Sequence, residues 1–66
     1  MANLVDGILT EIDRCNELVK QYEKIGPAGA FGRAAIKADI QEGKDALASG
    51  DVVRMVAACK ALKNCE

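Results

Sequence analysis

Residues 3–25 have the sequence NLVDGILTEIDRCNELVKQYEKI, and this stretch decides the fold. Its apolar side chains recur at alternating intervals of three and four residues, the spacing of the a and d positions of a heptad, at Val5, Ile8, Ile12, Cys15, Val19 and Tyr22. Further apolar residues widen this face on either side, at Leu4, Leu9, Leu18 and Ile25. The pattern predicts an amphipathic helix whose face is broad enough for the core of a helical bundle.

Both ends of this first helix carry stop or start signals. Asn3 is suited to cap the first turn, and Asp6 adds negative charge near the positive end of the helix dipole. Gly26-Pro27 ends the helix, because glycine suits a left-handed position and proline cannot continue the hydrogen-bonded ladder. Gly7 lies inside the helix, so we expect either fraying or the close approach of another backbone there.

A second helix is predicted over residues 28–48, with a start between Pro27 and Phe31. Its apolar face contains three glycines at helical spacing, in the series Gly29, Gly32, Ile36, Ile40, Gly43 and Leu47, with Phe31 and Ala35 beside it. Because glycine has no side chain, this face allows another helix to pack closely. Because the glycines lower the intrinsic helix propensity, this helix is expected to depend on tertiary contacts.

The turn Ser49-Gly50-Asp51 combines a C-cap with an N-cap and predicts a third helix over residues 52–64. Two short connections make the successive helices antiparallel. The sequence therefore predicts an all-α fold, a small three-helix antiparallel bundle with helices at about 3–25, 28–48 and 52–64, in a single helical domain spanning residues 1–66.

The chain offers little material for a core. Eleven of its 66 residues are alanine, and Tyr22 and Phe31 are its only aromatic residues, so a monomer is expected to be marginally stable. Small domains recover stability from disulfides, a metal or oligomerisation. Three cysteines without a CxxC pair and the absence of histidine disfavour the first two. We therefore expect homodimerisation to complete the bundle.

The expected dimer interface follows from helix lengths. The third helix is about half as long as the first, so part of the first helix's apolar face lacks a cover within the chain. A second copy can supply that cover by pairing the first helices or by packing on the glycine-marked face of the second helix. The residues predicted to form the interface are Ile12, Val19, Tyr22, Gly29, Gly32, Ile36 and Gly43.

The inventory of reactive side chains points away from catalysis. There is no histidine, one serine and one threonine, so no catalytic residue, no cofactor site and no metal site is predicted. The glycines at 26, 29 and 32 follow a helix and do not match a phosphate-binding loop. A redox role of Cys59 and Cys65 stays open. An enzyme would gain support only from a defined pocket around Cys59, Tyr22 or Arg33.

Charge and hydropathy limit the classes of partner that the chain is expected to bind. A net charge of −1 and a pI of about 5.3 disfavour general attraction to nucleic acid or to a membrane surface. No basic segment followed by an apolar run comes after Met1, so we expect a cytoplasmic protein. The favoured function is a non-catalytic protein-interaction module with an unknown protein partner. The alternative is a tri-helical nucleic-acid-binding regulator, suggested by Arg33, Lys37 and Lys44 on one side of the second helix.

Three segments resemble a group of short uncharacterised bacterial proteins, some of them prophage-encoded. The segments are YEKIGPAGAFG at residues 22–32, ALASGD at 46–51 and LKNCE at 62–66, and the resemblance covers most of the chain. It implies no activity, cofactor or site residue. It does imply an accessory protein that engages a host or phage macromolecule.

Overall fold

The computed structural model describes residues 3–65, and this part of the chain is helical throughout except at short connections. The elements are α1 (Leu4–Ile25), the 3₁₀ helix η1 (Gly26–Gly29), α2 (Ala30–Ser49) and α3 (Val52–Lys63). No strand occurs within residues 3–65. The prediction of an all-helical fold is confirmed.

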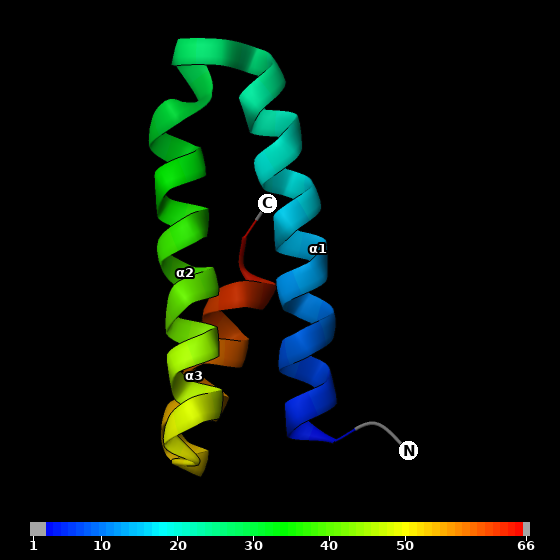
Figure 1. Ribbon diagram of the computed structural model, residues 1–66, viewed down its shortest axis with the longest axis vertical. Coiled ribbons are helices and arrows are strands. Elements are labelled where there is room, and N and C mark those ends of the chain that lie inside the picture. The colour runs from blue at the N-terminus through cyan, green and yellow to red at the C-terminus, as the bar shows by residue number, and fades with distance from the viewer. Residues whose placement is uncertain (1–2, 66) are drawn as a thin grey trace.

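The helices form a long hairpin with a short third helix at one end. Figure 1 shows α1 and α2 running antiparallel beside each other, with η1 joining them at one end and α3 at the other. α3 packs against both long helices. At 1.5 Å per residue, α1 is about 33 Å long and α3 only about 18 Å. The longest dimension of the molecule is 36 Å, so three helices overlap along only part of it.

The start of α1 agrees with the sequence signals. The Asn3 side chain accepts a hydrogen bond from the Asp6 backbone N–H at 2.9 Å. Gly26 has a φ of 81°, a conformation that side chains rarely adopt, so it allows the chain to leave the helix. Of the two alternatives expected at Gly7, the close approach of another backbone is wrong, because a Cβ added there would meet nothing within 4 Å.

The second helix begins at Ala30, inside the predicted window from Pro27 to Phe31 and two residues after the approximate bound of 28. The intervening η1 is a tighter 3₁₀ turn that contains Pro27. This turn brings Gly29 against the end of α1, where an added Cβ would lie 2.5 Å from the Tyr22 carbonyl oxygen. The glycine therefore permits a contact between backbones that an ordinary α-helical start does not require.

The connection between α2 and α3 has the predicted chemistry. Gly50 is left-handed, with a φ of 70°, and closes α2. Asp51 caps α3 by accepting hydrogen bonds from the backbone N–H groups of Val53 and Arg54 at 3.0 and 3.3 Å. α3 ends at Lys63, one residue before the expected end.

One core joins the three helices. Its side chains are small or aliphatic, and its buried members are Ile8, Ile12, Cys15, Val19, Ile36, Ile40, Ala46, Met55, Ala58, Cys59, Leu62 and Cys65. Leu4, Leu18, Tyr22 and Leu47 pack against this core while partly exposed. Because neither aromatic ring is fully buried, the apolar area that stabilises a single chain is modest.

Candidate interaction surface

The residues predicted to form a dimer interface lie between helices of the same chain. Five of them are buried, namely Ile12, Val19, Gly29, Ile36 and Gly43, and Tyr22 and Gly32 are half-buried. A Cβ added at Gly43 would lie 3.0 Å from Leu62 Cδ1 and 3.4 Å from Ile12 Cδ1. The glycine-marked face of α2 thus packs on α1 and α3, and the exposed surface of the molecule consists of other residues.

The C-terminal end of α3 reaches only the middle of the hairpin. The Arg14 guanidinium donates hydrogen bonds to the carbonyl oxygens of Leu62 at 2.6 Å and Cys65 at 2.9 Å. The Cys65 thiol donates to Asp39 Oδ2 at 3.2 Å. Arg14 and Asp39 therefore mark the level at which the third layer ends, and the part of the hairpin nearer η1 has two helices only (Figure 1).

The uncovered end carries the most exposed large apolar side chain of the described chain. Phe31 is 89% exposed and Ile25 is 57% exposed. Four alanines in the first half of α2 are also exposed, at Ala30, Ala34, Ala35 and Ala38. We call these six residues the hairpin-end surface. Contiguous exposed apolar patches mark binding sites more often than single exposed apolar residues do.

Four residues of the hairpin-end surface form a stripe. Phe31, Ala34, Ala35 and Ala38 have the spacing i, i+3, i+4 and i+7, which places them within a sector of about 100° on one side of α2. Sequence reasoning assigned Phe31 and Ala35 only a place beside the glycine series. The signal for a second apolar face was this spacing, but alanine is too common in helices for the pattern to be distinctive.

Other exposed apolar side chains lie at the covered end of the molecule. Val5 and Leu9 are on α1, and Val52, Val53 and Val56 are on α3. Val53 is 79% exposed and the other four are between 41% and 62% exposed. They border a core that already has three helices, so they do not mark a missing layer.

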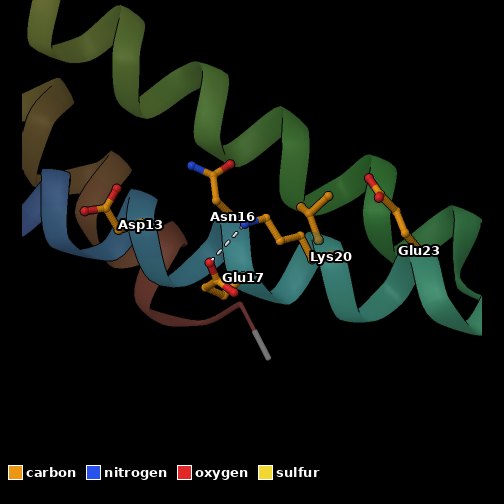
Figure 2. A pocket seen from close by; sticks show the side chains of 6 residues that line it. Asp13, Asn16, Glu17, Lys20 and Glu23 are labelled. Carbon is orange, nitrogen blue, oxygen red and sulfur yellow. Dashed lines mark hydrogen bonds and ion pairs between the residues drawn. The ribbon is translucent and has the colours of Figure 1, made fainter.

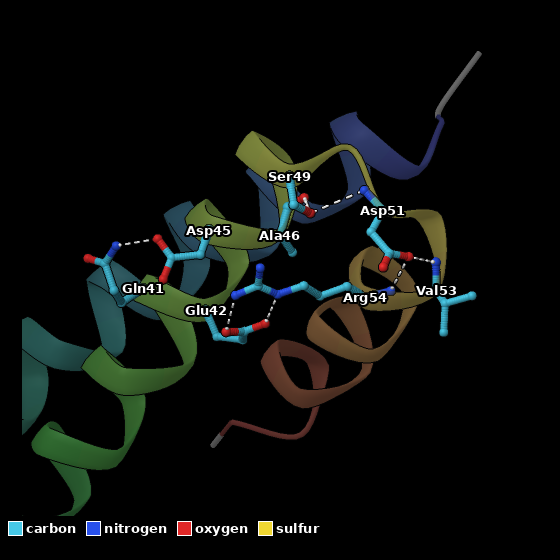
Figure 3. Close-up of polar contacts among 8 residues, drawn as sticks. All are labelled: Gln41, Glu42, Asp45, Ala46, Ser49, Asp51, Val53 and Arg54. Atoms are coloured by element: carbon cyan, nitrogen blue, oxygen red, sulfur yellow. Dashed lines mark hydrogen bonds and ion pairs between the residues drawn. The ribbon is translucent and has the colours of Figure 1, made fainter.

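An exposed ion pair connects α3 to α2, and a second polar contact lies within α2. Arg54 donates from Nε to Glu42 Oε2 at 2.7 Å and from Nη2 to Glu42 Oε1 at 3.0 Å (Figure 3). The hydrogen bonds from Arg54 lower the pKa of the Glu42 carboxyl group. Gln41 donates to Asp45 one helical turn further along α2. These carboxylates have structural partners, and no substrate is needed to explain their placement.

An open cleft lies along the polar side of α1. It has a volume of about 600 Å³, and its lining residues are Asp13, Asn16, Glu17, Val19, Lys20 and Glu23 (Figure 2). Glu17 and Lys20 in this cleft form an ion pair at 3.2 Å. The lining includes none of Cys59, Tyr22 and Arg33, the residues around which a pocket would have favoured an enzyme. The cleft is a solvated helix surface.

The three cysteines are buried and not linked by disulfides. Burial, together with the hydrogen bond to the Asp39 carboxylate, raises the pKa of the Cys65 thiol to about 12. A thiol with so high a pKa is protonated at neutral pH and is a poor nucleophile. The Cys15 thiol donates to the Leu62 carbonyl oxygen at 3.5 Å. Both groups contribute to fixing the end of α3.

A basic side of α2 is separate from the alanine stripe. Arg33, Lys37 and Lys44 form no ion pair with any residue between 3 and 65. Arg33 is half-buried, and both lysines are exposed. Their spacing of four and seven residues aligns them along the helix, as the sequence indicated. Three cations are a small basic surface compared with the footprint of typical DNA-binding domains.

Neither a metal site nor a membrane-spanning helix is found in the described residues, and comparison with known proteins adds no site. Among the residues that the structure describes, no group of three or more histidine, cysteine, aspartate or glutamate side chains is arranged to hold a metal ion. No helix in this part of the chain has the length and apolar character needed to cross a bilayer. Comparison with protein-family models, curated proteins and solved structures finds no match.

Proposed function

We propose that this chain is a small, non-catalytic protein-interaction module that binds its partner through the hairpin-end surface. The observation that carries the proposal is the 89% exposure of Phe31 at the end of the molecule that α3 does not cover. Burying a phenylalanine side chain contributes about 1.5–3 kcal/mol. Burying Phe31 and Ile25 against a partner would therefore stabilise the complex, because both side chains are exposed in the isolated chain.

The incomplete third layer gives this partner a structural role. α3 packs against both long helices, and a helix from a partner would extend this third layer along the hairpin. Small exposed side chains on α2 permit a close helix–helix approach. We propose that association completes the bundle, and that a second copy of the chain is one such partner.

The surroundings of the reactive groups support binding over catalysis. The Cys65 thiol is protonated and hydrogen-bonded, and Glu42 is engaged by Arg54. Three buried thiols are compatible with a reducing cytoplasm, where we propose that the protein acts. The resemblance to short bacterial and prophage proteins agrees with an accessory role.

Site-specific photo-cross-linking tests the proposed function. A benzophenone amino acid at position 31 is expected to yield discrete protein adducts in cells that produce the variant. The same group at Thr10, an exposed position among charged residues of α1, is the matched control and should give none. Equal labelling at both positions, or no protein adduct from position 31, would refute a binding role of the hairpin-end surface.

The second candidate is a nucleic-acid-binding regulator, favoured by Arg33, Lys37 and Lys44, cations that form no ion pair within residues 3–65. Against it, Asp51 places a carboxylate at the N-terminus of α3, the end from which a recognition helix normally contacts bases. The double variant R33E/K37E decides between the two candidates. Salt-dependent DNA binding that this variant abolishes would favour the regulator, whereas no binding by the wild type would remove it.

A further inference from the structure

We propose that Cys15 and Cys65 form a redox-sensitive pair, which a small-molecule disulfide such as oxidised glutathione converts into a covalent link between the middle of α1 and the end of α3. The sequence left a redox role of Cys59 and Cys65 open, and the structure brings a different pair together. The inference does not depend on the proposed interaction function, because neither Cys15 nor Cys65 belongs to the hairpin-end surface.

The two thiols meet at the last turn of α3. The Cys15 thiol donates to the Leu62 carbonyl oxygen at 3.5 Å, and the Cys65 thiol donates to the carbonyl oxygen of the preceding residue, Ala61, at 3.5 Å. Arg14, the neighbour of Cys15, donates to the Cys65 carbonyl oxygen at 2.9 Å and ties the segment after α3 to α1. Burial, the largest cause, and a hydrogen bond with the Cys15 thiol both raise the pKa of the Cys65 thiol. The two sulfur atoms are therefore close neighbours, as a disulfide requires.

Cys59 takes no part in this arrangement. It lies in the second half of α3, and the thiol hydrogen bonds found between residues 3 and 65 involve Cys15 and Cys65 only. Along the sequence, however, Cys59 is much nearer to Cys65 than Cys15 is. Proximity in the sequence and proximity in the fold thus predict different disulfides, and this difference makes the pairing testable.

The pair is protected while the segment after α3 stays in place. Cys15 is fully buried, and Cys65 is 8% exposed, with its thiol donating to Asp39 Oδ2 at 3.2 Å. Because Cys65 lies beyond Lys63, the last residue of α3, a small local opening releases its thiol from burial and from Asp39. The pKa of the released thiol returns to its ordinary value of 9.0, which gives a small thiolate fraction at neutral pH. The reaction therefore begins at Cys65.

The chemistry is thiol–disulfide exchange in two successive attacks. The Cys65 thiolate attacks one sulfur of oxidised glutathione, the S–S bond of glutathione breaks, and one glutathione thiolate leaves and takes up a proton. The Cys15 thiol then loses its proton to solvent and attacks the Cys65 sulfur of the mixed disulfide, and the second glutathione leaves and is protonated. Both cysteine sulfurs are oxidised, and oxidised glutathione is reduced to two thiols.

The link would lock the third layer onto the hairpin. It closes a loop that contains η1, α2 and α3, and a link across so long a loop strongly restricts the unfolded chain. In a domain of this size, a disulfide of ordinary strength should raise the midpoint of thermal unfolding by at least about 8 °C. A reductant should reverse this increase.

Peptide mapping after oxidation of the folded chain tests the pairing. The reduced full chain is incubated with oxidised glutathione, the remaining thiols are alkylated, and the product is digested with trypsin. Cleavage after lysine and arginine places each cysteine in its own peptide, at residues 15–20, 55–60 and 64–66, so mass spectrometry identifies every pair. The expected product joins residues 15–20 to residues 64–66 within one chain.

The same oxidation in concentrated urea is the matched control. Short loops close most readily in an unfolded chain, so the Cys59–Cys65 product should exceed the Cys15–Cys65 product by roughly tenfold. Folding should reverse this preference. A folded chain that still forms mainly the Cys59–Cys65 disulfide, or that stops at a mixed disulfide with glutathione, would overturn the inference.

Two serine variants connect the link to stability. Cys59→Ser should keep both the disulfide and the increase in the midpoint of thermal unfolding. Cys65→Ser, which retains a hydroxyl donor for Asp39, should lose both and should unfold at the same temperature with and without the oxidant. If Cys65→Ser gains as much stability on oxidation as Cys59→Ser does, the link between Cys15 and Cys65 is not the cause and the proposed lock is wrong.

Discussion

The two ends of the hairpin differ in how their apolar surface is covered. At the end distant from η1, α3 adds a third layer, and Leu62 is fully buried against Gly43 and Ile12. At the η1 end, α1 and α2 have only each other, and Phe31 remains 89% exposed. One end thus buries its apolar residues in the fold, and the other leaves Phe31 exposed at the surface for which we propose a binding role.

Truncating one apolar side chain at each end of the hairpin should give the largest difference in the free energy of unfolding. Leu62→Ala removes a fully buried side chain from the three-helix end and is expected to cost about 2–5 kcal/mol. Phe31→Ala should change the free energy of unfolding of the monomer by less than about 0.5 kcal/mol, because the ring is exposed. Urea unfolding followed by circular dichroism, at a concentration where the chain is monomeric, measures both. Similar losses for both variants would contradict the contrast between the ends.

Two glycines at the η1 end test how tightly its helices are joined. A Cβ at Gly29 would lie 2.5 Å from the Tyr22 carbonyl oxygen, so Gly29→Ala must shift backbone and should cost about 1–3 kcal/mol. A Cβ at Gly32 would lie 3.4 Å from the nearest atom of the Tyr22 ring, an ordinary contact. Gly32→Ala should therefore leave stability nearly unchanged or raise it, since alanine favours a helix. A Gly29→Ala variant as stable as the wild type would show that the η1 contact is loose.

The Cys65 thiol gives the covered end a dependence on alkaline pH. Folding raises its pKa from 9.0 to about 12, so the native state binds the proton more tightly than the unfolded chain does. The resulting stabilisation is complete below about pH 9 and is lost as the pH rises through about 12. The control is Cys65→Ser, which keeps a hydroxyl donor but does not ionise. Its free energy of unfolding should fall less steeply with pH above 9, and parallel curves would exclude this role of Cys65.

Capping and periodicity predicted the helices well. Asn3, Gly50 and Asp51 occupy the capping positions that the sequence assigned to them. The start of α2 was predicted only to within Pro27–Phe31, because the packing of Gly29 on the Tyr22 carbonyl depends on tertiary contacts. A local pattern shows where proline is tolerated, but it does not show whether the following residues form an α-helix or a tighter 3₁₀ turn.

The surface was harder to predict than the fold. The series containing Gly32, Ile36 and Gly43 indicated a close helix contact, but periodicity does not say whether the neighbour belongs to the same chain. In the structure α1 and α3 occupy that face. The extent of α3 decides which residues remain uncovered, and this extent depends on the contacts of Arg14 and Asp39 with the chain terminus. Such long-range contacts leave no periodic signal.

The smallest change in stability is expected for alanine substitutions at Gly7 and Gly43, both in the covered end of the molecule. A Cβ at Gly7 would meet nothing within 4 Å, so Gly7→Ala should raise the free energy of unfolding by about 0.4–1 kcal/mol through helix propensity and a less flexible unfolded chain. The same change at Gly43 brings a methyl group 3.0 Å from Leu62 Cδ1, so the neighbouring side chains must move and the propensity gain is offset. Thermal unfolding of both variants measures the difference. Equal stabilisation at the two sites would mean that α3 adjusts freely over α2, and the covered end would then be less tightly packed than its buried residues indicate.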